Sequence, residues 1–234
     1  MSKRRFEACE PELMDRLDAS PKELAAALHS LRGLNRYFGS YRIVLQFARR
    51  WIGRGDRMRI LDLATGSADI PRVVVDYARR VGAEVEIVAV DFQPATLEMA
   101  QVMSAAYPEI RCVRADVLEY EDAQLFDIVI CSLALHHFSD EDAVRLLRRA
   151  RELSRGYVLI SDLRRGFLAQ LGVYLLTTLI FRDRMTRRDG RASAAAAFSS
   201  AEMRELARRA GWTNFGAARF RFARQAIWLE PTMR

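Results

Sequence analysis

A short apolar run that ends in a turn of small residues constrains the fold of this chain more than any other feature. Residues 60–63 (Ile-Leu-Asp-Leu) are typical of a central strand in a parallel sheet, and residues 64–68 (Ala-Thr-Gly-Ser-Ala) are all small. Asp69, followed by Ile70 and Pro71, is typical of a helix N-cap with proline in the first turn. The segment therefore predicts an α/β unit with free backbone N–H groups at its turn.

Three further apolar runs end in polar or small residues. Residues 86–90 end at Asp91, residues 110–115 at Asp116-Val117, and residues 126–130 at Cys131-Ser132-Leu133. In a doubly wound sheet the carboxyl ends of the strands meet at one edge, where ligands bind. An acid about 20 residues beyond the turn accepts hydrogen bonds from ribose hydroxyls. Asp91 therefore predicts a nucleoside ligand, with Phe92 against its base.

Together these motifs resemble the class I S-adenosylmethionine-dependent methyltransferases, in particular the branch that methylates ubiquinone- and menaquinone-type quinones and other small natural products. The resemblance covers roughly residues 58–162 and rests on residues 61–69, Asp91, residues 115–117 and residues 126–138. It implies a Rossmann-like, doubly wound α/β sheet of seven strands, mostly parallel, with an antiparallel last hairpin. It also implies that S-adenosyl-L-methionine is the cofactor and S-adenosyl-L-homocysteine the product.

The resemblance assigns the cofactor to the strand ends: the first turn takes the methionine part, Asp91 the ribose, and Asp116 with its neighbour the adenine. The expected cofactor-binding residues are Asp62, Ala64, Thr65, Gly66, Ser67, Asp69, Asp91, Phe92, Asp116, Val117, Ser132 and Leu133. The family's turn has three glycines, but Ala64 and Ala68 replace the first and third here. A methyl group there costs little at negative φ and more at positive φ.

Residues 1–55 precede the cofactor motifs and contain two helical patterns. Residues 20–23 (Ser-Pro-Lys-Glu) predict a capping box that opens a helix through about Leu31, which Gly33 ends. A second helix is expected over about residues 34–51, with an interruption near Gly39. We expect these helices to form a lid over the methyltransferase domain, residues 56–234.

The lid also supplies candidates for the acceptor pocket. In the family that the chain resembles, N-terminal helices close over the substrate, which makes Asn35, Arg36, Tyr37 and Tyr41 candidates. The alternative is that the aromatic side chains belong to the core and that Arg36 is solvated.

A helical insertion is expected at about residues 163–198, after the predicted strand 157–162. Residues 167–181 are mostly apolar, but they are too short to span a bilayer, which takes about 20 residues. A helix that is apolar on nearly every side is buried, lines an apolar pocket or touches a membrane surface. We expect a helical cap over the site whose apolar helix also forms a wall for a lipophilic acceptor, with membrane contact as the alternative.

The C-terminal third predicts a helix and a hairpin. Residues 199–202 (Ser-Ser-Ala-Glu) form a capping box, and apolar residues at helical spacing follow until Gly211. Residues 215–222 and 225–229 are expected to form the last hairpin.

Cysteines and histidines suggest a reduced protein without a metal. Cys9, Cys112 and Cys131 are odd in number and scattered, so we expect free thiols, and no apolar leader follows the first six residues, which favours the cytoplasm. The chain has three histidines and no Cys-x-x-Cys spacing. A divalent ion held by carboxylates is the remaining alternative, although Cys131-Ser132 stands where a metal-dependent catechol methyltransferase would place an acid.

Positive charge gathers toward the C-terminus. Residues 145–234 hold 19 arginines and 7 acids, whereas residues 1–144 hold 18 basic and 23 acidic residues, which gives +12 against −5. Such a field suits an anionic substrate, an acidic carrier protein, a membrane surface or RNA. DNA is not expected, because no Asn-Pro-Pro-Tyr motif follows residues 126–130.

These patterns predict in-line transfer of a methyl group to a small lipophilic or aromatic acceptor: a phenol, a quinol or a polyketide-like molecule. Holding the two reacting atoms in line supplies most of the rate. A base is needed only for a protonated acceptor, and His137 is the preferred candidate, ahead of His136. The alternative is that one or both rings hydrogen-bond the backbone and shape the pocket. Arg164 is the candidate that orients an anionic acceptor. The alternatives are an RNA methyltransferase, and a non-methylating cofactor-binding protein, lyase or cyclase on the same fold.

Overall fold

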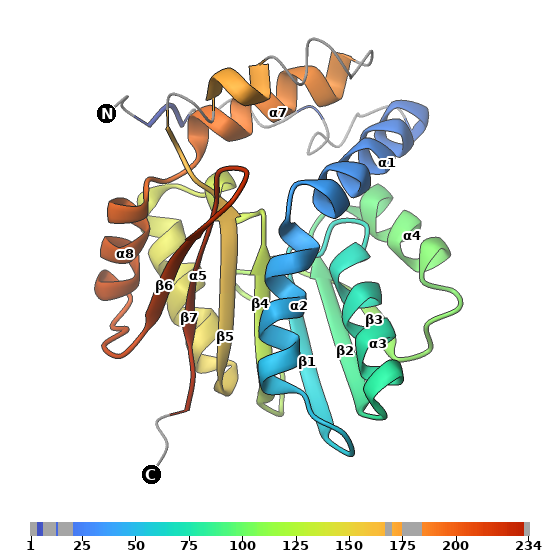
Figure 1. Ribbon diagram of the computed structural model, residues 1–234. Helices are drawn as coiled ribbons and strands as arrows, with labels where there is room; N and C mark the ends of the chain where they lie inside the picture. Colours follow the sequence, from blue (N-terminus) through green and yellow to red (C-terminus); the bar gives the residue numbers. More distant parts are fainter. Residues whose placement is uncertain (1–3, 7–12, 14–20, 167–169, 175–183, 232–234) are drawn as a thin grey trace.

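The computed structural model describes residues 4–6, 13, 21–166, 170–174 and 184–231 (Figure 1). Its centre is a seven-stranded sheet in the order β3-β2-β1-β4-β5-β7-β6. The strands are β1 (Arg57–Leu63), β2 (Glu84–Asp91), β3 (Ile110–Arg114), β4 (Phe126–Ser132), β5 (Ser154–Leu163), β6 (Gly216–Phe220) and β7 (Arg224–Leu229). The helices are α1 (Pro21–Tyr37), α2 (Ser40–Trp51), α3 (Asp69–Val81), α4 (Pro94–Met103), the short η2 (Leu135–His137), α5 (Asp140–Glu152), α7 (Arg184–Ala196) and α8 (Ser200–Arg209).

The sheet has the topology that the sequence predicts. β1 to β5 run parallel, and β7 lies antiparallel to β5 and to β6. The strand order reverses between β1 and β4, so the carboxyl ends of β1 and β4 flank the switch point where α/β folds bind ligands. The α/β, doubly wound, Rossmann-like assignment is therefore confirmed.

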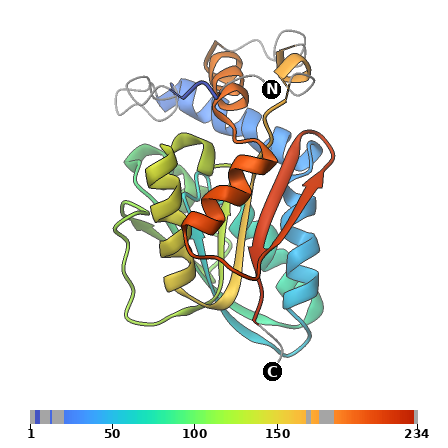
Figure 2. The same cartoon turned by 90° about the vertical axis from the view of Figure 1, so that its left-hand side faces the viewer.

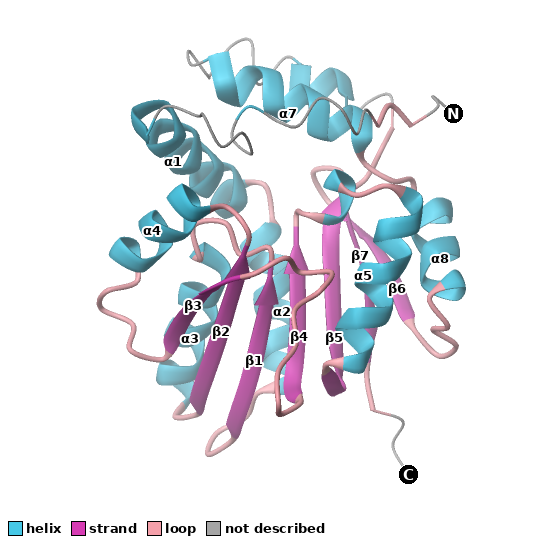
Figure 3. Ribbon diagram, turned by 180° about the vertical axis from the view of Figure 1, so that it is seen from behind, coloured by secondary structure: helices cyan, strands magenta, loops and turns pink. Residues whose placement is uncertain are grey.

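Helices cover both faces of the sheet, which is why β1, β2, β4 and β5 have runs of consecutive buried residues toward their carboxyl ends. Successive strand residues point to opposite faces. Leu61 belongs to the buried cluster that includes α5 and α8, whereas its neighbour Ile60 belongs to the cluster that includes α2 and α3. Figure 2 shows the layers from the side, and Figure 3 shows α5 and α8 in front of the sheet.

The N-terminal helices divide at a different residue from the one predicted. α1 continues through Gly33 to Tyr37, and the break falls at Gly39, which has a φ of 96°. Glycine reaches this left-handed conformation without the steric cost that other residues pay, so Gly39 is the residue able to separate the two helices. Ser20 of the predicted capping box lies outside the described residues, as does Cys9. Cys112 and Cys131 are free thiols, as expected.

Helix α7 lies above the carboxyl edge of the sheet, beside α1 (Figure 1). The backbone N–H of Arg5 donates to Ala195 O at 3.2 Å, which ties the N-terminal segment to α7. Residues 167–169 and 175–183, the larger part of the predicted apolar helix, lie outside the described residues. No helix in the described part of the chain is long and apolar enough to cross a membrane. The boundaries of lid and cap at residues 55, 163 and 198 stay predictions.

The C-terminal elements follow the sequence closely. Ser199 and Glu202 form the predicted capping box of α8, and Gly211 has a φ of 82° just beyond it. The hairpin of β6 and β7 turns through Phe222 and Ala223, both of which have positive φ. Arg164 N donates to Ala223 O at 2.7 Å, so this turn is held at the carboxyl end of β5.

Candidate active site

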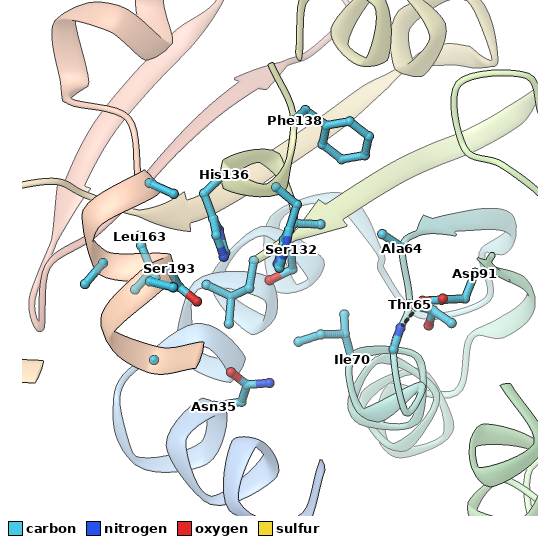
Figure 4. A pocket seen from close by; sticks show the side chains of 18 of the residues that line it. Asn35, Ala64, Thr65, Ile70, Asp91, Ser132, His136, Phe138, Leu163 and Ser193 are labelled. Carbon is cyan, nitrogen blue, oxygen red and sulfur yellow. Dashed lines mark hydrogen bonds between the residues drawn. The ribbon is translucent and has the colours of Figure 1, made fainter. Parts of the chain in front are cut away.

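A cavity of about 860 Å³ opens at the carboxyl edge of the strands, beneath α1 and α7. All twelve predicted cofactor-binding residues line it, together with His136, His137 and Arg164. Figure 4 shows Ala64, Thr65 and Asp91 on one side and His136, Leu163 and Ser193 on the other. Residues that lie up to about 100 positions apart in the chain therefore meet at the carboxyl ends of the strands, as expected for a ligand site in a doubly wound sheet.

The turn after β1 adopts the conformation that glycine favours, although two of its three key positions hold alanine. Ala64, Gly66 and Ala68 have φ of 56°, 56° and 55°. The left-handed conformation costs an L-residue about 1–2 kcal/mol, so each alanine carries strain that glycine would not. Asp69 is the first helical residue of α3 rather than its N-cap, because Ala68 takes the capping position without a side-chain hydrogen bond.

Asp91 joins the end of β2 to this turn. Its Oδ2 accepts from Gly66 N at 2.8 Å, and its Oδ1 accepts from Gln93 N at 3.0 Å. The carboxylate is thereby fixed at the cavity wall, and Phe92 beside it keeps 51% of its surface exposed. A Cβ placed on Gly66 would meet no atom within 4 Å, so the turn borders open space.

Asp62 is a deeply buried acid that lines the cavity. Its side chain accepts from Thr65 Oγ1 at 2.5 Å, and 3% of the residue is exposed. Burial, with Asp69 and Asp91 nearby, raises the pKa of Asp62 to about 8, although the Thr65 hydroxyl acts in the other direction. A positively charged ligand group beside Asp62 would favour its ionised form.

Helix α1 presents a different face to the cavity from the one expected. Arg36 and Tyr37 are exposed, Tyr37 by 72%, and neither lines the cavity. The lining residues of this region are Leu28, Arg32, Asn35 and Phe38. Because each helical residue turns by about 100°, placing the inward face one position wrong moves a side chain out of the site.

Asn35 and Tyr41 both reach Asp69 at the start of α3. Asn35 Nδ2 donates to Asp69 Oδ2 at 2.9 Å. Burial, the charge of Asp69 and a hydrogen bond to it raise the pKa of Tyr41. Tyr41 therefore contacts the start of α3 and, contrary to expectation, does not line the cavity.

His136 is held by a carboxylate that the sequence analysis did not select. His136 Nδ1 lies 2.7 Å from Asp162 Oδ1, and the backbone N–H of His136 donates to Asp162 Oδ2 at 2.8 Å. Both residues are at most 3% exposed, and the ring of His137 lies against that of His136 at a centroid distance of 4.2 Å and an interplanar angle of 34°. Asp162 is the next-to-last residue of β5, and Asp91 is the last residue of β2. A search for acids at the carboxyl ends of the predicted strands would therefore have found Asp162 as well.

Arg4 fixes the segment that carries the histidines. Its Nη2 donates to His136 O at 3.1 Å and to Phe138 O at 2.6 Å, and its Nη1 pairs with Asp140 at 2.9 Å. The guanidinium also lies 3.8 Å from the ring centroid of Phe198. Nothing in the local sequence around Arg4 predicts these contacts, because they join residues more than 130 positions apart.

No group of three or more histidine, cysteine, aspartate or glutamate side chains among the described residues is arranged to hold a metal ion.

Comparison with known proteins gives one family and a common fold. Residues 60–156 match the family described as a methyltransferase domain. The ubiquinone/menaquinone biosynthesis C-methyltransferase UbiE of Idiomarina loihiensis is 30% identical over 139 residues, which cover 57% of this chain and 54% of that protein. The 2-phytyl-1,4-naphtoquinone methyltransferase of Trichormus variabilis is 36% identical over 107 residues, 44% of this chain and 45% of that protein. The chain thus spans about half the length of these relatives or less.

Solved structures share the fold at low identity. Human N-acetylserotonin methyltransferase in complex with SAM superposes with a TM-score of 0.68 at 15% identity, over 97% of this chain and 62% of that chain. Magnesium protoporphyrin IX methyltransferase from Synechocystis PCC 6803 with bound SAH superposes with a TM-score of 0.58 at 15% identity, over 83% of this chain and 84% of that chain.

Proposed function

We propose that this chain, which belongs to the class I S-adenosylmethionine-dependent methyltransferases, transfers a methyl group to a small lipophilic or aromatic acceptor. The observation that carries the proposal is the convergence of all twelve expected cofactor residues and an aspartate-held histidine on one cavity. The relatives named as quinone methyltransferases favour a phenol, a quinol or a polyketide-like acceptor.

The residues present fit S-adenosylmethionine. Asp91 would hold the ribose hydroxyls, Phe92 would lie against the adenine, and Asp116 with Val117 would hold its edge. Asp62 and the turn would take the amino-acid part, where the space in front of Gly66 leaves room for it. When bound, the cofactor supplies a methyl group on a sulfonium, which is an activated leaving group.

The chain's own residues would position the acceptor and supply a base for its proton. Walls from α1, α7 and the β4–η2 segment surround the cavity and would hold the acceptor oxygen or carbon in line with the methyl carbon. Asp162 fixes the ring of His136 through Nδ1, and we propose that the other ring nitrogen, Nε2, takes the acceptor's proton. We therefore favour His136 over His137 as the base, the reverse of the preference at the sequence level.

Calorimetric titration with S-adenosylmethionine and S-adenosylhomocysteine, followed by an assay on phenolic and quinol acceptors, tests the proposal. We expect micromolar binding and methylated product with at least one acceptor class. Failure to bind either cofactor form would contradict the proposal. Tight binding without methylation of any acceptor would favour the non-methylating alternative instead.

The RNA alternative gains little from the structure, because many arginines of the C-terminal third are paired with acids. Such pairs include Arg145 with Glu119, Arg155 with Asp127, Arg165 with Glu202, and Arg209 with Glu141. Retention on RNA that weakens steeply with salt would revive this alternative.

A further inference from the structure

The cavity is lined by acids and by arginines, among them Arg5, Arg32 and Asp142 in addition to the residues that follow. The acids Asp62, Asp69, Asp91 and Asp116 line the end that we assign to the cofactor. At the other end, next to His136, the lining includes Arg164 and Arg224. Arg164 was predicted from the sequence to orient an anionic acceptor, whereas Arg224 was not predicted to take part.

Arg224 is a buried cation at the start of β7. It is 6% exposed and pairs with Leu163 across the sheet, at the carboxyl end of β5. Its Nε donates to Phe38 O at 3.2 Å, and this is the hydrogen bond that the guanidinium makes within the described part of the chain. A guanidinium has five N–H donors, so four remain for another partner.

The hairpin around Arg224 is built to hold that guanidinium in place. Phe222 packs edge-on against Phe38 at a centroid distance of 5.5 Å, and both rings line the cavity. The side-chain amide of Gln225 donates to Leu163 O at 3.0 Å and to Phe198 O at 2.8 Å. Arg224 is therefore hydrogen-bonded to Phe38, and its neighbour Gln225 is hydrogen-bonded to Leu163 of β5.

Asp162 stabilises the positive charge of Arg224 by electrostatic attraction, without a hydrogen bond between the two side chains. The pKa of Arg224 is lowered to about 10 by burial, which outweighs the opposing effect of Asp162, so the guanidinium remains charged at neutral pH. The oxygens of Asp162 accept instead from His136 and from the backbone N–H of Leu163, at 2.6 Å in the latter case. A buried cation with unused donors is costly unless a partner binds it.

Arg164 adds a second incompletely paired guanidinium to the same wall. Its Nε is buried and has no hydrogen-bond partner among the described residues. Arg165, the next residue, does not line the cavity, and its guanidinium donates to Ala197 O and to Glu202. Arg164 and Arg224 thus differ from the arginines that stabilise the fold.

We propose that the methyl acceptor carries a carboxylate, which Arg224 binds with the help of Arg164 while the reacting group lies beside His136. A carboxylate is the planar anion that matches the forked donors of a guanidinium. The apolar rings of Phe38 and Phe222 would cover the hydrophobic part of the same molecule, so the acceptor class is an aromatic or otherwise lipophilic acid. This inference rests on the proposed function and makes it more specific.

The test compares an acid with its neutral ester on protein saturated with S-adenosylhomocysteine. The probes are 3-hydroxy-2-naphthoate and its methyl ester, and fluorescence titration gives the Kd of each. The wild type should bind the acid at least tenfold more tightly than the ester. Arg224→Gln should weaken the acid by about tenfold to a hundredfold and change the ester less than threefold. Arg224→Lys should fall between, because it keeps the charge and loses the fork.

Arg221→Gln is the matched control. It removes the same charge from the same hairpin, but Arg221 is exposed and does not line the cavity. Its acid-to-ester ratio should equal that of the wild type. If Arg224→Gln does not fold, as judged by loss of S-adenosylhomocysteine binding, Arg164→Gln serves as the second variant and should lower the ratio at least threefold.

Two outcomes would overturn the inference without touching the proposed function. In one, the wild type binds S-adenosylhomocysteine but does not prefer the acid. In the other, Arg224→Gln weakens acid and ester equally, which would assign Arg224 a structural role. Failure of the wild type to bind S-adenosylhomocysteine would instead contradict the proposed function itself.

Discussion

Asp91 Oδ2 accepts a hydrogen bond of 2.8 Å from the backbone N–H of Gly66, so the end of β2 is joined directly to the turn after β1. One carboxylate thus shapes the turn and faces the cavity. It links the two motifs that, 25 residues apart, first indicated a nucleoside site. Loss of this side chain should therefore affect both the turn and the ligand.

Asp91→Ala should weaken S-adenosylhomocysteine binding at least tenfold. Hydrogen bonds to a charged group contribute about 1.5–3 kcal/mol each, and the variant removes those to the ribose as well as the one to Gly66. Calorimetric titration measures the effect. Asp127→Ala is the control, because that acid accepts from Arg59 N at 2.8 Å at the opposite end of the sheet. Equal affinities for Asp91→Ala and the wild type would refute the assignment.

Ala64→Gly should stabilise the protein. The left-handed φ of 56° costs alanine about 1–2 kcal/mol, whereas glycine pays about 0.5–1 kcal/mol in chain entropy, so the net gain is up to about 1.5 kcal/mol. Urea unfolding gives the free energy. Ala26→Gly, at an exposed position inside α1, should instead destabilise by about 1 kcal/mol. The strain argument is wrong if both variants lose stability alike.

The strand ends were predictable from sequence because their signal is local. An unbroken apolar run marks a strand covered on both faces, and its carboxyl end falls where the run stops. Asp62, Asp91 and Ser132 were found in this way. The positive φ of Ala64 and Ala68 was not predictable, because alanine gives no sign of the conformation that its neighbours impose.

The acceptor end was harder to predict because it depends on how distant segments meet. Arg224 reaches the cavity only because β7 lies antiparallel to β5, which places its first residue beside Leu163. The face of α1 depends on how the helix rotates about its axis, and the local sequence does not fix that rotation. Asn35 therefore lines the cavity as expected, whereas Arg36 and Tyr37 do not.

Asp62 should make stability depend on pH. Its carboxyl has a pKa of about 8 in the folded protein and 3.8 as its ordinary value, so the folded state holds more protons between these limits. Stability should then fall as pH rises from about 4 to about 8. Urea unfolding at several pH values should show a shallower fall for Asp62→Asn. Asp76→Asn, an exposed acid on α3, should follow the wild type.

The same acid should couple cofactor binding to proton release. A cationic ligand group beside Asp62 lowers its pKa, so binding near pH 7 should release a proton. Calorimetry in buffers of different ionisation enthalpy would show this as a heat that changes with the buffer. Asp62→Asn should lose that dependence, and an unchanged dependence in the variant would assign the proton to another group.

His136 and Asp162 should act as a unit on an acceptor with a phenolic hydroxyl. His136→Ala should lower kcat by about a hundredfold or more, since general-base catalysis contributes about 10²–10⁴-fold. Asp162→Asn should lower kcat in the same direction, because the bond of 2.7 Å to His136 Nδ1 fixes the ring. His137→Ala should cost less than tenfold. Binding of S-adenosylhomocysteine, measured in all three variants, should change little and so exclude unfolding as the cause. A loss in His137→Ala that exceeds the loss in His136→Ala would reverse the assignment of the base.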